Sequence, residues 1–283
     1  MRLIDSHCHL NYEGLVERQA EVLENARERG VAGFLNISTR QREWDDIIAV
    51  AEREPDVWAS VGVHPHEADA HPDLGAAALA EAADHPRVIA IGECGLDYYY
   101  DKSDRAAQRE RFQAHIEAAR QTGFPLVIHT REAEEDTAEI LEAAVKEGGV
   151  TGVLHCFTGS AELARKGLDL GFYVSLSGIV TFKNAADLQA IAKWLPADQM
   201  LVETDSPFLA PVPHRGQKLL PKIGPAIDED ALPAAFDEDR GSQAIIARLG
   251  GVALAPVVAD LRNPGRRPAA EYSNLQLLLG FLE

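Results

Sequence analysis

Short apolar runs alternate with longer amphipathic segments along most of the chain. Each run is rich in β-branched residues and has few polar interruptions, which is typical of strands buried on both faces of a parallel sheet. We predict eight such strands, at Arg2–Ser6, Val31–Thr39, Val57–Val63, Val88–Gly92, Pro125–His129, Thr151–Phe157, Phe172–Ser177 and Gln199–Thr204.

The segments between these runs are rich in Ala, Glu, Arg and Leu and have the length of helices. Several of them end at a glycine, which is a common residue just after a helix. Eight strands with seven intervening helices predict an α/β protein of the (β/α)8 TIM-barrel type, which we expect to be a single domain over residues 1–283. The helices are predicted at Gly14–Arg29, Gln41–Arg53, Asp73–Asp84, Ser103–Thr122, Glu132–Lys146, Ser160–Leu170 and Lys183–Leu195.

The C-terminal part of the chain has a different pattern. Residues 216–271 are rich in Pro, Gly, Ala and Asp and show weak periodicity, so the pattern defines no regular structure for most of them. Helices are predicted only at Ser242–Leu249 and Ala270–Leu282. A lid over the barrel and an interface are both open as roles for this atypical segment.

Composition narrows the class of protein. Apolar residues make up 46% of the chain and charged residues 25%, which is ordinary for a globular protein. The formal net charge of −18 argues against a protein that coats duplex DNA, because such binding depends on a basic surface.

The apolar runs are too short to cross a membrane, and charge at Arg2 and Asp5 does not suit a secretion signal. The three cysteines do not suggest a disulfide framework. We therefore expect a cytoplasmic protein, and the sequence predicts neither a membrane contact nor a protein partner.

Ionisable residues close several of the apolar runs. His7 and His9 follow the first run and, two residues apart, point to the same face of a strand. The C-terminal ends of parallel barrel strands meet at one mouth, where unpaired charges would be costly to bury. A metal centre accounts for such a convergence, and six ligands suit two metals bridged by a carboxylate. The other candidate ligands are Glu93, His129, His155 and Asp205.

The cysteines Cys8, Cys94 and Cys156 each follow a candidate ligand. By strand alternation we expect all three to face away from the metals and to pack as small buried hydrophobic residues. The alternative is that they bind zinc as thiolates.

Six short segments form a specific combination of motifs: Asp5–Leu10, Gly62–His66, Ile91–Tyr98, Pro125–Arg131, His155–Gly159 and Glu203–Pro211, followed by Pro213–Gly216. Together they resemble the TatD family of metal-dependent deoxyribonucleases, within the amidohydrolase-like superfamily. The resemblance runs in order from residue 1 to about residue 216. After Gly216 the chain departs from the family pattern, which leaves the final helix and any substrate contact from that region undefined.

The resemblance implies two divalent metal ions per chain, with magnesium, manganese and zinc all open. It also implies hydrolysis of phosphodiester bonds, and the acidic charge favours a 3′-5′ exodeoxyribonuclease that trims single-stranded or frayed DNA ends. Asp205 would orient the attacking water and accept its proton. In this assignment His7, His9 and Asp205 bind the first metal, His129 and His155 bind the second, and Glu93 bridges the two.

Further residues are candidates for substrate contact or for support of the ligands. His64 or His66 could contact the substrate phosphate or a nearby carboxylate, and Glu203 could orient His7 or His9. Arg131 and Arg215 are candidate phosphate clamps.

The aromatic run from Tyr98 to Tyr100 could stack an unpaired base or pack at the rim of the barrel.

Two alternative functions remain open at this stage. The same metal centre could hydrolyse an ester or amide, for example in the deacylation of an aminoacyl-tRNA, because the fold does not decide the bond. Alternatively, the protein could be a non-catalytic scaffold with a structural metal, although structural zinc sites are closed and four-coordinate. Two exchangeable ions would indicate the enzyme, and one tightly held ion would indicate the scaffold.

Overall fold

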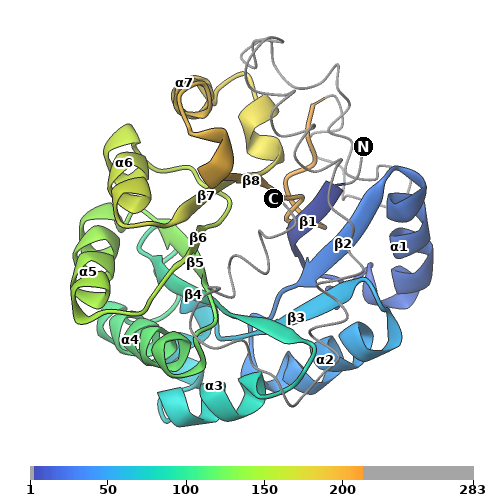
Figure 1. Ribbon diagram of the computed structural model, residues 1–283, viewed down its shortest axis with the longest axis horizontal. Coiled ribbons are helices and arrows are strands. Elements are labelled where there is room, and N and C mark those ends of the chain that lie inside the picture. Colours follow the sequence, from blue (N-terminus) through green and yellow to red (C-terminus); the bar gives the residue numbers. More distant parts are fainter. Residues whose placement is uncertain (1–2, 213–283) are drawn as a thin grey trace.

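The computed structural model describes residues 3–212, which form a barrel of parallel strands surrounded by helices (Figure 1). The strands lie in chain order around the sheet, so the predicted (β/α)8 barrel is confirmed. The strands are β1 (Leu3–Cys8), β2 (Val31–Asn36), β3 (Val57–Val61), β4 (Val88–Asp97), β5 (Leu126–Arg131), β6 (Gly152–Leu154), β7 (Tyr173–Leu176) and β8 (Met200–Val202).

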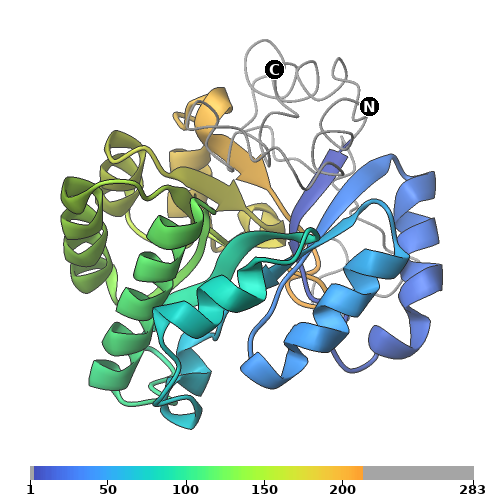
Figure 2. The same cartoon turned by 60° about the horizontal axis from the view of Figure 1, so that its bottom comes forward.

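The α-helices connect successive strands and cover the outside of the barrel (Figures 1 and 2). Each of the seven helices predicted between the strands is present, and the first two begin with a tighter 3-10 turn. The α-helices of the described residues are α1 (Gln19–Glu28), α2 (Trp44–Arg53), α3 (Ala76–Ala83), α4 (Arg105–Thr122), α5 (Glu134–Glu147), α6 (Ala161–Asp169) and α7 (Ala186–Ala192). The 3-10 helices are η1 (Val16–Arg18), η2 (Gln41–Glu43), η3 (Pro65–Ala70), η4 (Gly178–Thr181) and η5 (Ala197–Gln199).

Part of the predicted chain lies outside the described residues. This applies to the atypical segment of residues 216–271, to the helices predicted at Ser242–Leu249 and Ala270–Leu282, and to Arg215. Within residues 3–212, no helix combines the length and the apolar character that a membrane span requires.

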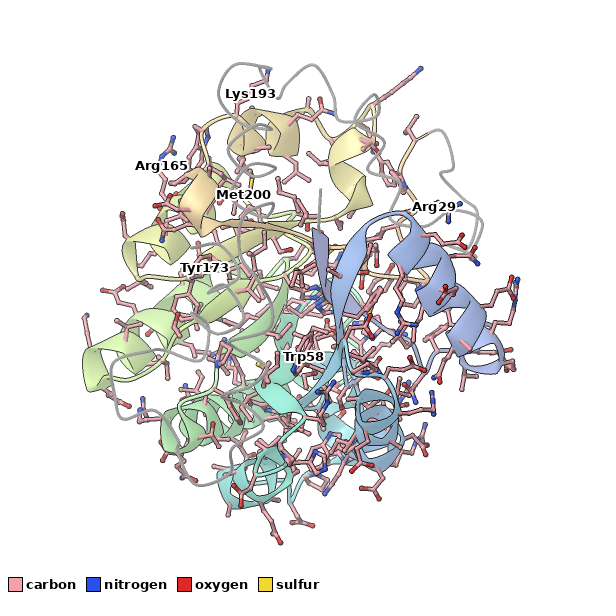
Figure 3. All side chains as sticks on the ribbon, turned by 45° about the vertical axis from the view of Figure 1, so that its right-hand side comes forward. Arg29, Trp58, Arg165, Tyr173, Lys193 and Met200 are labelled. Carbon is pink, nitrogen blue, oxygen red and sulfur yellow. The ribbon has the colours of Figure 1, made fainter. Side chains whose placement is uncertain are left out.

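The interior of the barrel is a packed apolar core. Every strand contributes at least one side chain to it, and the contributors from β5, β6 and β8 lie two residues before a polar residue at the mouth. Trp58 of β3 and Tyr173 of β7 belong to this core (Figure 3). The core therefore fills the barrel beneath the mouth, and the candidate polar residues lie above it at the C-terminal ends of the strands. Its members are Leu35, Ile37, Trp58, Ile89, Ala90, Val127 and Val153, with Ile4, Tyr173 and Leu201 packed against them.

A second apolar layer lies between the strands and the helices. Ile128 of β5 and Leu154 of β6 are fully buried in it, as are Phe112 and Ile116 of α4. Since alternate residues of β5 and β6 enter the two layers, the strands are buried on both faces, as their uninterrupted apolar sequences predicted.

β4 is longer than its sequence predicted. We expected it to end at Gly92, but it continues to Asp97 and pairs with β5 along that extension. An irregularity in register between Gly92 and Cys94 changes the direction of the side chains, which is a common role of a β-bulge. Gly92 and Gly95, in this part of the strand, are required by close backbone packing against β5. At Gly95, with φ of 119°, a Cβ atom would lie 2.0 Å from the carbonyl oxygen of His129.

The loop after β8 joins the last strand to the first. The backbone N–H and the hydroxyl of Thr204 both donate to the carboxylate of Asp5, at 3.0 and 2.6 Å. The backbone N–H of Asp205 donates to the carbonyl of His7 at 2.9 Å. The closure of the barrel thus places Asp205 directly beside the histidines of β1.

Candidate metal centre

Strand alternation carries the candidate side chains into the mouth of the barrel. His129 lies two residues after Val127 of the interior core, and His155 lies two residues after Val153. Their side chains therefore continue the inward-facing rows of β5 and β6 above the apolar core. Glu203 follows Leu201 in the same way after β8.

The first group of possible ligand atoms comes from β1 and the loop after β8. The Nε2 atoms of His7 and His9 lie 3.2 Å apart, and Oδ1 of Asp205 lies 3.6 Å from the first and 3.4 Å from the second. All three residues are buried. Three atoms that carry lone pairs thus face one another in a largely buried group of side chains.

Glu93 lies at the centre of the site. Its Oε2 atom is 3.5 Å from Nε2 of His7, while its Oε1 atom faces the opposite group of imidazoles. The distances from Oε1 are 3.3 Å to Nε2 of His64, 3.3 Å to Nδ1 of His129 and 2.8 Å to Nε2 of His155. One carboxylate therefore connects two sets of nitrogen atoms, as a bridging ligand would.

The separations between these atoms suit a divalent cation. Bonds of about 2.0–2.2 Å in a tetrahedral site place the ligand atoms roughly 3.3–3.6 Å from one another. Most of the distances above fall in or close to this range. Among the described residues, three groups of ligand atoms lie close enough to hold an ion: His7 with His9 and Asp205, His7 with Glu93 and His155, and His64 with Glu93 and His129.

The second nitrogen of three imidazoles is held by an acceptor, which is the usual arrangement for histidines that bind metals. Nδ1 of His9 lies 3.3 Å from the carbonyl of Ile37, and Nδ1 of His155 lies 3.3 Å from Oε1 of Glu203. Nε2 of His129 lies 3.0 Å from Oδ2 of Asp97. These contacts orient each ring so that its other nitrogen faces the centre of the site.

The position of Glu203 corrects one expectation. We predicted that it would orient His7 or His9, but its carboxylate accepts from the backbone N–H of Cys156 at 2.7 Å and contacts His155. The reason is that the chain turns sharply after β6, with Cys156 at φ of 42°, and this turn presents both groups to Glu203.

Burial and charge determine the protonation of the site. Burial lowers the pKa of His7 to about 3, with a further lowering by the nearby His155, and burial also lowers the pKa of His64 to about 4. Burial alone would raise the pKa of Glu93, but attraction to His155 and His64 outweighs it and holds that pKa well below its usual range. At His155 and His129, by contrast, the interactions with Glu93 and Asp97 outweigh burial and raise the pKa of each ring. Because a cation binds the neutral imidazole, its binding would release protons from these two rings.

His64 and His66 have different surroundings. His64 joins the group around Glu93 and is therefore a possible ligand. The sequence had suggested only a substrate contact or a supporting contact for it. His66 instead places its Nε2 atom 2.9 Å from Oδ2 of Asp97. Asp97 is fully buried and contacts both His66 and His129, yet its role was missed from the sequence. The only signal for it was a polar residue after Leu96, in a stretch that we expected to be a loop.

The remaining candidates lie at the rim or outside the described residues. The guanidinium carbon of Arg131 lies 5.2 Å from the ring centre of Tyr99 and 5.1 Å from that of Tyr100. Tyr98 packs at the rim, where its hydroxyl donates to Asp136 at 2.5 Å. Arg215, the other proposed phosphate clamp, is outside the described residues.

The cysteines do not join the candidate ligands. Cys8 and Cys94 are buried in the apolar layer that faces the helices, as expected. Cys156 differs from the expectation, because it is half-buried and its sulfur lies 3.1 Å from the hydroxyl of Ser177. Burial raises the pKa of each thiol well above its usual value, which disfavours thiolate ligands. None of the ligand groups found among residues 3–212 contains a cysteine.

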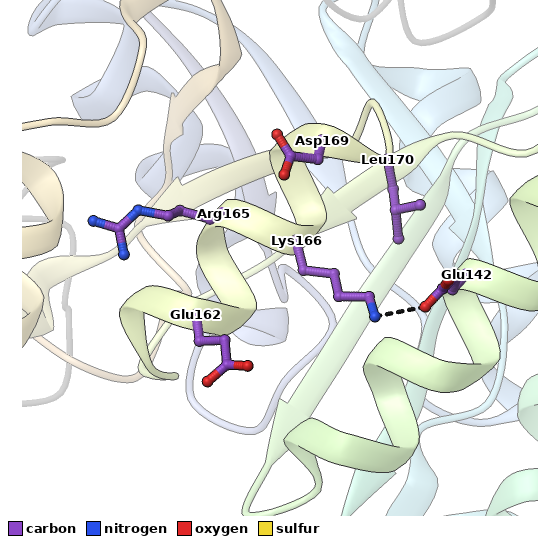
Figure 4. A pocket seen from close by; sticks show the side chains of 6 residues that line it. All are labelled: Glu142, Glu162, Arg165, Lys166, Asp169 and Leu170. Carbon is purple, nitrogen blue, oxygen red and sulfur yellow. Dashed lines mark ion pairs between the residues drawn. The ribbon is translucent and has the colours of Figure 1, made fainter.

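A pocket on the outside of the barrel is separate from this centre. It lies between α5 and α6, and its charged side chains include Lys166, which pairs with Glu142 at 2.5 Å (Figure 4). Because α5 and α6 belong to the outer layer of helices, this hollow does not open into the mouth of the barrel (Figure 1).

Comparisons with known proteins agree with the geometry. The family model described as "TatD related DNase" matches residues 4–229. An uncharacterised metal-dependent hydrolase of Escherichia coli, YcfH, is 44% identical over 227 residues, which cover 79% of this chain and 84% of that protein. A protein of Erwinia tasmaniensis named "3'-5' ssDNA/RNA exonuclease TatD" is 34% identical over 211 residues, covering 74% and 81%. The crystal structure of the TatD homologue YJJV from Escherichia coli superposes with a TM-score of 0.71 at 25% identity, covering 99% of this chain and 96% of the other.

Proposed function

Because this chain belongs to the family of TatD-related DNases, a family of metal-dependent hydrolases, we propose that it removes nucleotides from the 3′ ends of single-stranded or frayed DNA. The observation that carries this proposal is the position of Glu93, whose two carboxylate oxygens face two different sets of nitrogen atoms. Such an arrangement suits two metal ions held side by side.

The donor set supports this assignment. His7, His9 and Asp205 would hold one ion, His129 and His155 would hold the other, and Glu93 would contact both. The structure adds His64 as a possible further ligand. Histidine-rich ligation suits zinc or manganese, whereas carboxylate oxygen suits magnesium, so the metal is a matter for experiment.

Bound metals would supply Lewis acidity and a water of lowered pKa. The chain itself supplies the acceptor for the proton of that water. Asp205 is the best placed group for this role, because it stands at the edge of the mouth after β8 and its backbone is anchored to His7. Its φ of 54° lies in the left-handed region, which Asp tolerates better than most residues. The turn directs its carboxylate toward the imidazoles of β1.

The type of substrate follows from two further observations. The relative from Erwinia tasmaniensis is named as an exonuclease of single-stranded DNA and RNA. The net charge of −18 disfavours a protein that grips long duplexes through their phosphates, because that grip needs a basic surface. A single phosphodiester that enters a metal-lined mouth at the end of a strand requires no such surface.

The test is digestion of a 5′-labelled single-stranded DNA oligonucleotide in Mg²⁺, Mn²⁺, Zn²⁺ or EDTA. We expect stepwise shortening from the 3′ end that requires metal and that is lost in Asp205→Asn. The exposed Asp45→Asn on α2 is the matched control and should cleave like the wild type.

Two results would contradict the proposal. If metal-loaded wild type leaves the oligonucleotide intact, the nuclease assignment is wrong, and assays with ester and amide substrates, including aminoacyl-tRNA, become the next step. If the protein retains one non-exchangeable ion and hydrolyses none of these substrates, it is a scaffold with a structural metal.

A further inference from the structure

Exposed aromatic side chains gather at the mouth of the barrel. In the described part of the chain, five large hydrophobic side chains are exposed, and four of them are aromatic: Tyr12 (43% exposed), Tyr99 (57%), Tyr100 (51%) and Phe208 (40%). Scattered exposed hydrophobic residues are normal and need no explanation. These four are not scattered, since each is in ring contact with another of them, and two also contact a histidine of the site.

The first pair lies beside the ligand group of β1. The rings of Tyr12 and Phe208 are 4.9 Å apart between centres and nearly perpendicular. The Phe208 ring is 6.0 Å from that of His9. Tyr12 follows β1 and Phe208 follows β8, so the seam that brings Asp205 to the histidines also forms this pair.

The second pair lies on the opposite side, after β4. The rings of Tyr99 and Tyr100 are 4.8 Å apart, and the Tyr100 ring is 5.5 Å from that of His66. The backbone N–H groups of both tyrosines donate to Oδ1 of Asp97, at 3.1 and 2.9 Å. Asp97 therefore fixes this pair relative to His66, while the guanidinium of Arg131 lies over both rings.

A continuous row of imidazoles connects the two pairs. From His9, neighbouring ring centres are 4.9 Å apart to His7, then 3.9 Å to His155, 5.7 Å to His129 and 6.2 Å to His66. The exposed aromatic pairs therefore stand at the two ends of the candidate metal centre, one beside each set of ligands.

We propose that Tyr12 with Phe208, and Tyr99 with Tyr100, are two base-stacking subsites that hold the unpaired bases on either side of the cleaved phosphodiester. This proposal rests on the nuclease function proposed above. Aromatic faces bind bases of any sequence by stacking. Bases inside a duplex are already stacked on their neighbours and must be unpaired before they can reach such a site. The two subsites would thus select single strands without a basic groove, which agrees with the acidic charge of the protein.

The charged group at the second pair fits the same substrate. Arg131 can contribute a cation–π contact to the tyrosine rings while its N–H groups face a neighbouring phosphate. A nucleotide carries a flat base close to a phosphate, so it can contact the tyrosine rings and the guanidinium together. An amide or a simple ester has no base to stack.

The test measures binding separately from cleavage. Full-length protein carrying Asp205→Asn is titrated, with Mn²⁺ present, into single-stranded DNA that contains the fluorescent base 2-aminopurine at the terminal or the penultimate 3′ position. Phe208→Leu and Tyr100→Leu are introduced separately, because leucine keeps apolar bulk and removes the ring. Each is expected to weaken binding by about 5- to 150-fold and to relieve quenching at one of the two positions.

Val16→Ala is the matched control, because Val16 is as exposed as Tyr12 but belongs to neither pair. It should bind like the parent protein. The same titrations are repeated with an abasic nucleotide at each position. If a ring stacks on a base, removal of that base should lower the affinity of the parent protein by about 5- to 150-fold. The affinity of the matching leucine variant should change little or not at all.

The outcomes separate this inference from the proposed function. Two results would contradict the stacking subsites while the nuclease function stands, provided that wild type shortens the oligonucleotide. In the first, both leucine variants bind like Val16→Ala. In the second, base removal lowers the affinity of every variant equally. If wild type shortens no oligonucleotide with any metal, both proposals fall together.

Discussion

The carboxylate of Asp97 lies 3.0 Å from Nε2 of His129 and leaves the other nitrogen of that ring to face Glu93. Asp97 is itself completely buried, with both backbone N–H groups of Tyr99 and Tyr100 on its second oxygen. Its interactions with His129, His66 and these N–H groups outweigh burial and hold its pKa below the usual value for Asp, so it is an anion at neutral pH.

Replacement of Asp97 by Asn should weaken metal binding. The amide keeps the size of the side chain and an oxygen for the tyrosine N–H groups, but it removes the charge that orients His129. Loss of such a partner typically costs 10- to 100-fold in metal affinity. We expect a loss of about this size for one of two binding steps, measured by calorimetric titration of the apoprotein with Zn²⁺ or Mn²⁺.

The control for that measurement is Asp101→Asn, an exposed rim residue that pairs with Arg105. It should titrate like the wild type. Equal affinities for the wild type and Asp97→Asn would show that the carboxylate does not support the ligand.

Removal of metal should destabilise the whole barrel. The buried carboxylates of Glu93 and Asp205 lie beside imidazoles that a cation would bind, and an ion bound only by the folded state raises its stability. An ion present at about a thousand times its Kd contributes about 4 kcal/mol, which corresponds to a shift on the order of 10 °C in the thermal midpoint.

Thermal unfolding with and without EDTA measures this effect, and added metal should restore the midpoint. Glu93→Gln lacks the bridging charge and should respond much less to EDTA. Identical midpoints for wild type in both conditions would argue against a resident ion.

The buried His115 should make stability depend on pH. This residue of α4 is fully buried, and its Nε2 atom accepts from the backbone N–H of Val63 at 2.9 Å, next to His64. Burial lowers its pKa from 6.5 to about 4, so the folded protein favours the neutral ring. The contribution of the neutral ring to the free energy of unfolding is therefore fully present above about pH 6.5 and is lost as the pH falls toward 4. The total loss is on the order of 3 kcal/mol.

Urea unfolding between pH 4 and 7 compares wild type with His115→Gln. The amide does not titrate, and it can accept from Val63 and donate to the carbonyl of Arg111, which lies 2.6 Å from Nδ1 of His115. The difference in unfolding free energy should shrink or reverse as the pH falls. Parallel curves for the two proteins would remove His115 as the source of the pH dependence.

Gly95 should tolerate no side chain. Its φ of 119° disfavours other residues, and a Cβ atom would meet the carbonyl oxygen of His129 at 2.0 Å. Gly95→Ala should lower the free energy of unfolding by roughly 2–5 kcal/mol through backbone strain and overpacking.

Gly75→Ala provides the comparison, because an added Cβ there meets no atom within 4 Å. This substitution should lower the free energy of unfolding by less than about 1 kcal/mol in the same denaturation experiment. Similar costs at the two positions would show that the contact with His129 can relax.

The pattern of the sequence determined the order and type of the elements and the side of the strands on which the chemistry lies. Val127 and Val153 are apolar and inward, so strand alternation alone carried His129 and His155 into the mouth. The same rule places His7 beside His9. These conclusions depend on contacts between near neighbours in the chain, and for that reason one sequence is enough to reach them.

The partners of these residues were decided only by the tertiary structure. Asp97 reaches His129 because β4 continues past its glycines, and Glu203 reaches His155 rather than His7 because the chain turns at Cys156. A bulge shifts the phase of a strand, and a turn brings together residues that are distant in sequence. Periodicity carries no information about either event, since the packing of separate segments against one another selects them.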